Sequence, residues 1–173
     1  LLENNFNLKQ IAALISKGNI LAIYQGKSES GRRALCNRSI LADPRNPLIR
    51  DILNKKVKHR PLYRPFAPVI MREQVKEWFQ IDIDSPYMSH AIPFRLDKID
   101  RVPSIVHKDG TGRLQTLTRD DNPWMYELLE SWESLTKCPI LINTSFNDNE
   151  PIVESPEDAL LCFMKTSIDY LIF

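Results

Sequence analysis

The chain has 173 residues, a net charge of +1, 43% hydrophobic residues and 26% charged residues. These values are typical of one globular domain with a single sizeable core. The sequence excludes a membrane-spanning helix, because such a helix needs about 18 consecutive apolar residues and no apolar run approaches that length. The first ten residues also lack the basic start and apolar block of a secretory signal. Since the chain begins with Leu rather than Met, we expect a fragment of a longer protein or a processed chain.

The cysteines and histidines are few and scattered. No two histidines stand three or four residues apart, and the cysteines lack the paired spacing of a zinc site or a disulfide framework. We therefore expect a reduced, cytoplasmic protein with no metal site within this chain. The residues are Cys36, Cys138 and Cys162, with His59, His90 and His107.

The first half of the chain is expected to alternate helices and strands. Asn7 can cap a helix with an apolar stripe, and Asn46-Pro47 has the cap-and-proline signature of a second helix start. Pro68 should confine its strand to a sheet edge or a bulge. In chain order, the pattern predicts helix 8–17, strand 20–24, strand 39–42, helix 48–55, strand 66–71 and helix 72–79.

In the second half, several strands follow one another before the helices resume. Asn122-Pro123 and Ser155-Pro156 carry helix-start signals. The pattern predicts strands 91–95, 104–106 and 114–117, helix 123–135, strand 139–143, helix 158–164 and strand 170–173. Consecutive central strands favour a single α/β (α+β) domain spanning 1–173, with a twisted mixed sheet and flanking helices, over a purely parallel doubly wound sheet.

Positive charge is concentrated between residues 32 and 72. This stretch holds eleven Lys and Arg residues against two Asp residues. Such a local excess attracts a polyanion, which could be a nucleotide, a phosphorylated metabolite or a nucleic acid. A solvated basic face is the alternative.

Two basic segments carry the candidate anion-binding side chains. Residues 31–39 combine Gly31, which lets backbone approach a ligand, with arginines whose forks can hold phosphate oxygens through two hydrogen bonds. Residues 58–66 hold Lys58 and Arg60, which would converge on one anion if this stretch is extended, because alternate residues of a strand share a face. Exposed arginines on surface loops are the alternative for both segments.

Two polar segments are further candidates. Residues 141–147 form an apolar strand that ends in short polar side chains, and open sheets often bind ligands at strand tips. A turn rich in side-chain to backbone hydrogen bonds is the alternative. Residues 107–113 form a glycine-containing turn that is not a Walker A loop, and a simple hairpin turn at Asp109-Gly110 is its alternative.

Read together, six motifs resemble the C-terminal domain of the carbamoyltransferase family of NodU- and CmcH-type O-carbamoyltransferases. They are GRRALCNRSILADPR, LNKKVKHRPLYRPFAPVI, IVHKDGTGRLQTL, NPWMYELL, PILINTSFN and EPIVESPEDAL. The resemblance runs from about Ile20 to the last residue and implies a YrdC-like fold. Proteins of that fold mark their nucleotide site with Lys-x-Arg and Ser-x-Asn, which resemble Lys58-His59-Arg60 and Ser145-Phe146-Asn147 here.

The resemblance also implies a function. Such a domain binds ATP, with Mg²⁺, and carbamoyl phosphate, and it forms carbamoyl adenylate. An N-terminal Kae1-like partner domain, fused or separate and absent from this chain, then transfers the carbamoyl group to a hydroxyl. The residues expected to carry the chemistry are Lys58, Arg33, Arg64 and Ser145. The residues expected to bind substrate or nucleotide are Arg60, Asn143, Asn147, Arg38, His107, Asp109 and Arg113.

The chain departs from the family pattern Glu-Phe-Gly-Pro-Arg-Ala-Leu-Gly at residues 29–36. Arg32 stands in place of proline, and Cys36 replaces a glycine that can require positive φ. Asn149 replaces a further glycine, which is a milder change. Two alternatives follow: a catalytically impaired nucleotide-binding module, and a basic nucleic-acid-binding domain, although aromatics for base stacking are few.

Overall fold

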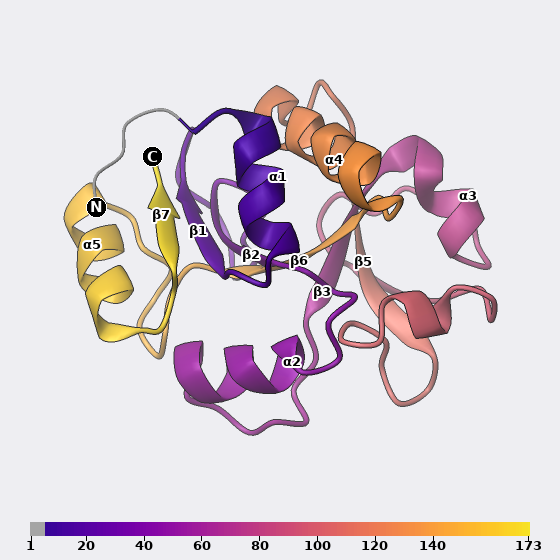
Figure 1. Ribbon diagram of the computed structural model, residues 1–173, viewed down its shortest axis with the longest axis horizontal. Coiled ribbons are helices and arrows are strands. Elements are labelled where there is room, and N and C mark those ends of the chain that lie inside the picture. The colour runs from indigo at the N-terminus through magenta and orange to yellow at the C-terminus, as the bar shows by residue number, and fades with distance from the viewer. Residues whose placement is uncertain (1–5) are drawn as a thin grey trace.

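The computed structural model describes residues 6–173, and the expectation made for the first five residues lies outside them (Figure 1). Within 6–173, seven strands form one sheet in the order β4-β5-β3-β6-β2-β1-β7. The pairs β1–β7 and β3–β5 are parallel and the other four are antiparallel. The strands are β1 (Leu21–Tyr24), β2 (Arg38–Ala42), β3 (Ala67–Met71), β4 (His90–Pro93), β5 (Thr111–Leu117), β6 (Ile140–Ser145) and β7 (Tyr170–Ile172).

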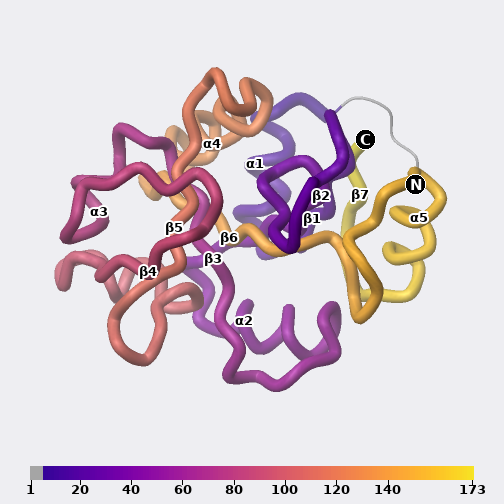
Figure 2. Tube along the Cα trace, turned by 180° about the vertical axis from the view of Figure 1, so that it is seen from behind, coloured from indigo at the N-terminus to yellow at the C-terminus, as the bar shows by residue number. Residues whose placement is uncertain are grey.

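Helices cover both faces of this sheet. The helices α1 and α4 pack against each other on one face, and α2 lies on the opposite face (Figure 1). The view from behind places α3 and β4 at one end of the molecule and α5 and β7 at the other (Figure 2). The helices are α1 (Leu8–Ser16), α2 (Ile49–Ile52), the π-helical η1 (Leu53–Val57), η2 (Arg72–Gln74), α3 (Val75–Trp78), η3 (Ile99–Arg101), α4 (Pro123–Thr136) and α5 (Pro156–Lys165).

The core divides into two layers because successive strand residues point to opposite faces. In β6, Leu141 joins the layer under α1 and α4, whereas Ile140 and Ile142 join the layer that contains buried residues of α2, α3 and α5. The predicted α/β class with a mixed sheet and flanking helices is confirmed. No described helix combines the length and apolar character needed to cross a membrane.

Of the four predicted helix starts with side-chain caps, that at Asn46 is wrong and the other three are confirmed. Helix α2 begins at Ile49 without a side-chain cap, and Asn46 Oδ1 instead accepts from the Leu48 amide at 3.0 Å in the preceding turn. The Asn7 side chain accepts a hydrogen bond from the Gln10 amide, and the Gln10 side chain accepts one from the Asn7 amide. Asn122 caps α4, with proline in its first turn. Ser155 and Asp158 form the same reciprocal capping box at the start of α5. Caps of this kind contribute about 1 kcal/mol each and fix where the helix begins.

The prediction of an edge position or bulge for Pro68 is wrong. β3 lies between β5 and β6, and Pro68 pairs in register with Ile142. Proline is accommodated because the pairing of β3 with β5 begins only at Val69, so no ladder hydrogen bond from position 68 to β5 is needed. On the β5 side Gly112 leaves room: a Cβ there would lie 3.4 Å from the Pro68 ring and 2.5 Å from Phe94.

Two further local predictions are wrong. Residues 104–106 form no strand; the Ser104 amide donates to the Pro44 carbonyl at 3.3 Å, and the apolar run reflects loop burial, with Ile105 fully buried. The stretch from Lys58 to Arg60 is not extended either. Lys58 ends the π-helical turn with helical dihedrals (φ −96°, ψ −10°), and His59 has φ 43°.

Candidate functional site

A cleft of about 300 Å³ opens where β6 ends and β3 and β5 begin. Arg113 of β5, Ala67 of β3 and Asn143 of β6 contribute to its wall. Further along the same sheet face, Val69 and Leu141 continue into the core under α1 and α4. The cleft therefore occupies the end of a sheet face that the two helices leave uncovered. Its other lining residues come from the β1–β2 loop, the segment after η1, the β3–β4 connection and the loop after β6.

The cleft is strongly cationic. Among the described residues that line it, one carboxylate, that of Asp148, faces six cationic side chains: Arg32, Arg33, Lys58, Arg60, Arg64 and Arg113. Burial and the neighbouring charges of Arg64 and Arg113 lower the pKa of Arg60 to about 10. Burial, followed by Arg33 and Arg64, also lowers the pKa of Arg113. These guanidinium groups repel one another, so an anion placed among them is favoured.

Lys58 joins the two predicted motifs physically. Its ammonium lies within hydrogen-bond distance of four acceptors: the Ser145 carbonyl, Ser145 Oγ at 3.2 Å, and the carbonyl and Oδ1 of Asn147 at 2.8 and 2.7 Å. Ser145 Oγ in turn donates to Asn147 Oδ1 at 2.7 Å. Burial, followed by the charge of Arg60, lowers the pKa of Lys58 to about 7. The motif residues thus lie together although the chain separates them by more than eighty residues.

The segment that carries Arg60 and Arg64 is fixed by Asn54, a residue of η1 that sequence reasoning missed. Asn54 Nδ2 donates to the carbonyls of Leu62 and Arg64 at 3.2 and 2.9 Å, and its Oδ1 accepts from Arg60 Nε at 2.6 Å. The side chain is fully buried. A lone polar residue within a basic helical run gave no distinguishing signal, because polar residues on helices usually face solvent.

The β1–β2 loop is organised by Glu29, also missed. One carboxylate oxygen, Oε1, accepts from the amides of Leu35 at 2.7 Å, Asn37 at 2.9 Å and Arg38 at 3.2 Å. Cys36 has φ 80°, so the inference that this position favours glycine is confirmed. Its thiol is fully buried, and burial, followed by the charge of Glu29, raises its pKa strongly, which makes it a poor nucleophile.

A second, more open depression of about 610 Å³ lies beside the cleft, and Pro65 lines both. Thr111 Oγ1 donates to Asp109 Oδ1 at 2.8 Å and lies 2.9 Å from His107 Nδ1. Because the hydroxyl has one proton, His107 Nδ1 must carry the other, and Nε2 of the neutral ring is an acceptor. Burial lowers the pKa of His107 and favours that neutral form. Within 6–173, Nε2 has no hydrogen-bond partner. The lining residues are Arg50, Tyr63, Pro65, Val106, His107, Lys108 and Asp109.

Eight of the eleven predicted site residues line the cleft: Arg33, Lys58, Arg60, Arg64, Arg113, Asn143, Ser145 and Asn147. His107 and Asp109 line the adjacent depression. Arg38 lies in neither: its guanidinium stacks 3.6 Å from the Tyr24 ring centre and donates to the backbone of the β1–β2 loop. Their functional roles stay predictions.

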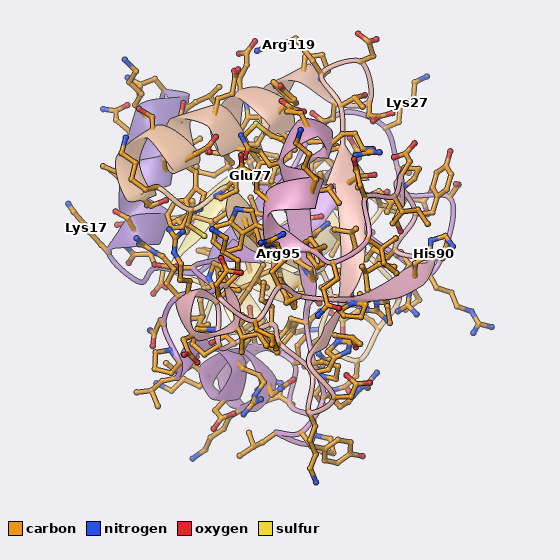
Figure 3. The ribbon with its side chains drawn as sticks, turned by 90° about the vertical axis from the view of Figure 1, so that its right-hand side faces the viewer. Lys17, Lys27, Glu77, His90, Arg95 and Arg119 are labelled. Carbon is orange, nitrogen blue, oxygen red and sulfur yellow. The ribbon has the colours of Figure 1, made fainter. Side chains whose placement is uncertain are left out.

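Two charged side chains away from the cleft point outward. Figure 3 shows Lys17, after α1, and Arg119, before α4, at the outer surface. Arg119 is paired with Glu127 and Glu130 at 2.9 and 2.7 Å. Neither lines the cleft, so both positions can serve as controls.

Comparisons with known proteins agree with this picture. A family model described as "Carbamoyltransferase C-terminus" matches residues 12–173. Nodulation protein NolNO of Sinorhizobium fredii is 44% identical over 93% of this chain and 24% of its own length. The 3'-hydroxymethylcephem-O-carbamoyltransferase of Amycolatopsis lactamdurans is 36% identical over 88% of this chain and 29% of its own length. The chain thus spans about a quarter to a third of the curated relatives it matches.

Among solved structures, full-length HypF in its phosphate- and nucleotide-bound form superposes with a TM-score of 0.67 and 21% identity. The match covers 99% of this chain and 25% of HypF. At this identity the likeness concerns the fold, and it confirms the predicted YrdC-like α/β architecture.

Proposed function

The chain belongs to the carbamoyltransferase family and corresponds to the C-terminal domain of its members. From this premise we propose that it forms carbamoyl adenylate from ATP and carbamoyl phosphate. In this reaction water first converts carbamoyl phosphate to carbamate and phosphate. A carbamate oxygen then attacks the α-phosphorus of ATP, the bond to the bridging oxygen breaks, and pyrophosphate leaves.

The observation that carries the proposal is the set of six cations around one cleft of about 300 Å³. Adenylation moves negative charge onto the α-phosphate and the departing pyrophosphate, and fixed cations lower the barrier to such a step. In this proposal Arg33, Arg60 and Arg64 hold phosphate oxygens. HypF, of which this chain matches 25%, was itself solved in a phosphate- and nucleotide-bound form.

Lys58 is proposed to act at the α-phosphate. Its ammonium, which has three protons, is surrounded by four oxygen acceptors of Ser145 and Asn147. A phosphate oxygen can therefore replace one of them without leaving the remaining acceptors far from a donor. Ser145 and Asn147 would keep the lysine aligned while ATP binds.

The adjacent depression suits the adenine of the same ATP. Tyr63, Pro65 and Val106 provide an apolar wall against which the adenine ring could pack. ATP would enter as its magnesium complex, since one carboxylate among the described cleft residues, that of Asp148, is too few to hold Mg²⁺ by itself.

Transfer of the carbamoyl group to a hydroxyl is proposed to need a further region of the protein. The chain covers about a quarter to a third of its curated relatives, and we propose that a Kae1-like domain, fused or separate, completes the reaction. That domain would set the acceptor.

The test is pyrophosphate release by this chain from ATP and carbamoyl phosphate. We expect Lys58→Ala to lower the rate about a hundredfold, the usual loss when one transition-state contact is removed. Lys17→Ala, a lysine outside the cleft, should leave the rate unchanged. An unaltered rate in Lys58→Ala would contradict the role of this lysine.

A second candidate is a nucleotide-binding module without the chemistry. It is favoured by the β1–β2 loop, where Cys36 occupies a positive-φ position and Arg32 replaces proline. Calorimetry separates the two: ATP binding with no pyrophosphate release in the presence of carbamoyl phosphate supports the module.

A further inference from the structure

Helix α5 has apolar side chains on both of its faces. On its inner face, Ala159 and Cys162 are buried in the core layer that also contains residues of α2 and α3. Its outer face carries Leu160, Leu161 and Met164, which are 44%, 50% and 74% exposed. A surface helix normally has charged and polar residues on its outer face, whereas a helix that is apolar all round is buried. Among the described residues, the outer face of α5 therefore lacks the cover that its sequence calls for.

The three exposed side chains form one patch, which we call the α5 patch. At 3.6 residues per turn, positions 160, 161 and 164 lie within about 100° of one another around the helix axis. Single exposed apolar residues are common, whereas a contiguous group is typical of an interface. Figure 1 and Figure 2 place α5 at one end of the molecule, so a partner can approach its outer face. The patch lines neither the cleft nor the depression beside it.

Two charged residues flank the patch at equal distances from its centre. Glu157 lies four residues before Leu161, and Lys165 lies four residues after it, in the first and last turns of α5. Both are exposed, and within 6–173 neither makes an ion pair. Eight residues of helix span about 12 Å, whereas ion pairs within a helix join residues three or four apart. The acidic end and the basic end of the patch are therefore both unpaired.

A second copy of the same helix, running antiparallel, supplies both missing partners. A two-fold axis near Leu161 brings the apolar side chains of the two copies together and places Glu157 of each copy opposite Lys165 of the other. A parallel copy would place like charges opposite each other. An unrelated partner would have to present the same order of charges on its own surface, whereas a second copy has that order by symmetry.

We propose that this chain forms a two-fold dimer through α5, with the α5 patches of both copies at the centre and a Glu157–Lys165 ion pair at each end. One helix per copy buries less than the about 1,200 Å² at the lower limit of standard interfaces, so the dimer is weak and forms with rising concentration. Because the cleft is not part of this surface, the inference is independent of the proposed function.

Sedimentation velocity over a concentration series from about 10 µM to about 1 mM, the range of weak association, tests the dimer. We expect the weight-average mass to rise from that of one chain toward that of two. Leu161→Gln replaces the apolar group at the axis and should raise the dissociation constant at least about tenfold. Lys17→Ala, a change outside the patch, should leave the dissociation constant as it is.

An exchange of charges tests the antiparallel arrangement. Glu157→Lys places lysines opposite each other at both ends, and Lys165→Glu places glutamates there, so each change alone should weaken association about tenfold. The double variant Glu157→Lys/Lys165→Glu restores opposite charges and should recover the original dissociation constant. Both changes oppose the helix dipole, so the double variant should be the least stable monomer. Its recovery therefore cannot come from a better fold.

Three results overturn the proposal. A chain that stays monomeric over the whole series leaves the patch to the region of its relatives that this chain does not span. A dimer that survives Leu161→Gln uses a different surface. A double charge variant that associates no better than the single variants removes the antiparallel pairing. If Leu161→Gln does not fold, unchanged association in both single charge variants, whose altered side chains are exposed, overturns the dimer as well.

Discussion

At the scale of single residues, the protonation of Lys58 should make the ATP affinity of the cleft depend on pH. Burial, with the charge of Arg60, lowers its pKa to about 7, so the free protein loses the ammonium as pH rises through that value. Bound phosphates would stabilise the ammonium and raise the pKa in the complex. Affinity for ATP should therefore be greatest below about pH 7 and fall above it, by at most about tenfold per pH unit for one linked proton.

Calorimetry of ATP binding from pH 6.5 to 8.5 checks this expectation. Lys58→Met should bind ATP more weakly at low pH and show a flatter profile, because the linked proton is gone. Parallel profiles for the two proteins would assign the pH dependence to groups other than Lys58.

Cys36 offers a separate test of backbone strain. Its φ of 80° places a residue with a Cβ in the left-handed region, which costs about 1–2 kcal/mol. Glycine has no such penalty, whereas alanine retains it. We expect Cys36→Gly to be more stable than Cys36→Ala by about 1 kcal/mol in urea unfolding, the reverse of the usual order. If alanine is the more stable, this loop carries no strain that glycine can relieve.

At the scale of helices and strands, the capping and proline signals in the sequence predicted the helix starts that local hydrogen bonds determine. The capped helices α1, α4 and α5 begin within two residues of their expected positions. Elements set by tertiary contacts escaped prediction. Pro68 suits a central strand only because of where the β5 ladder begins, and the π-helical turn before Lys58 depends on the bonds Asn54 makes to the following loop.

That loop gives a prediction at the same scale. Asn54→Ala leaves the carbonyls of Leu62 and Arg64 and the Nε of Arg60 without their partner. We expect a loss of about 2 kcal/mol in the free energy of unfolding, together with weaker ATP binding because Arg60 and Arg64 are no longer held. Urea unfolding and calorimetry measure the two effects.

Asn19→Ala is the matched control for Asn54→Ala. The side-chain amide of Asn19 likewise donates a hydrogen bond to a backbone carbonyl, that of Leu14, at 2.8 Å. Asn19 follows the end of α1 and lies away from the cleft. It should cost some stability and leave ATP affinity unchanged. Unchanged ATP affinity in Asn54→Ala as well would show that the loop keeps its shape without Asn54.

At the scale of the whole molecule, the candidate site shows what a sequence alone can and cannot predict. The polar tip of β6 and the basic loop after η1 were identified by residue type, and the fold brings them within hydrogen-bond distance. The position of Arg38 could not be inferred, because the same arginine-rich segment sends some side chains to the cleft and this one to Tyr24. Gln115 lies in a predicted strand, but its hydrogen bond with Asn143 could not be inferred, because it reaches across β3, which lies between β5 and β6.

The cluster of cations also couples function to global stability, because like charges close together destabilise the empty protein. Replacing two exposed cleft arginines, in the double variant Arg33→Gln/Arg64→Gln, should raise the ligand-free Tm by about 1–2 °C, a small change because exposed charges are screened. Pyrophosphate at about 100 times its Kd should stabilise the unaltered chain by about 2.7 kcal/mol. The double variant should lose most of that response.

The control removes the same net charge outside the cleft. Arg95 lies 3.4 Å from Asp97, and Arg119 is paired with two glutamates; Figure 3 labels both arginines. Arg95→Gln/Arg119→Gln should therefore not be stabilised, and it should keep the full pyrophosphate response in thermal unfolding. If the two double variants behave alike, net charge rather than the cleft determines the response. If the cleft variant alone gains stability and loses pyrophosphate binding, the same repulsion that weakens the empty fold is what an anion relieves.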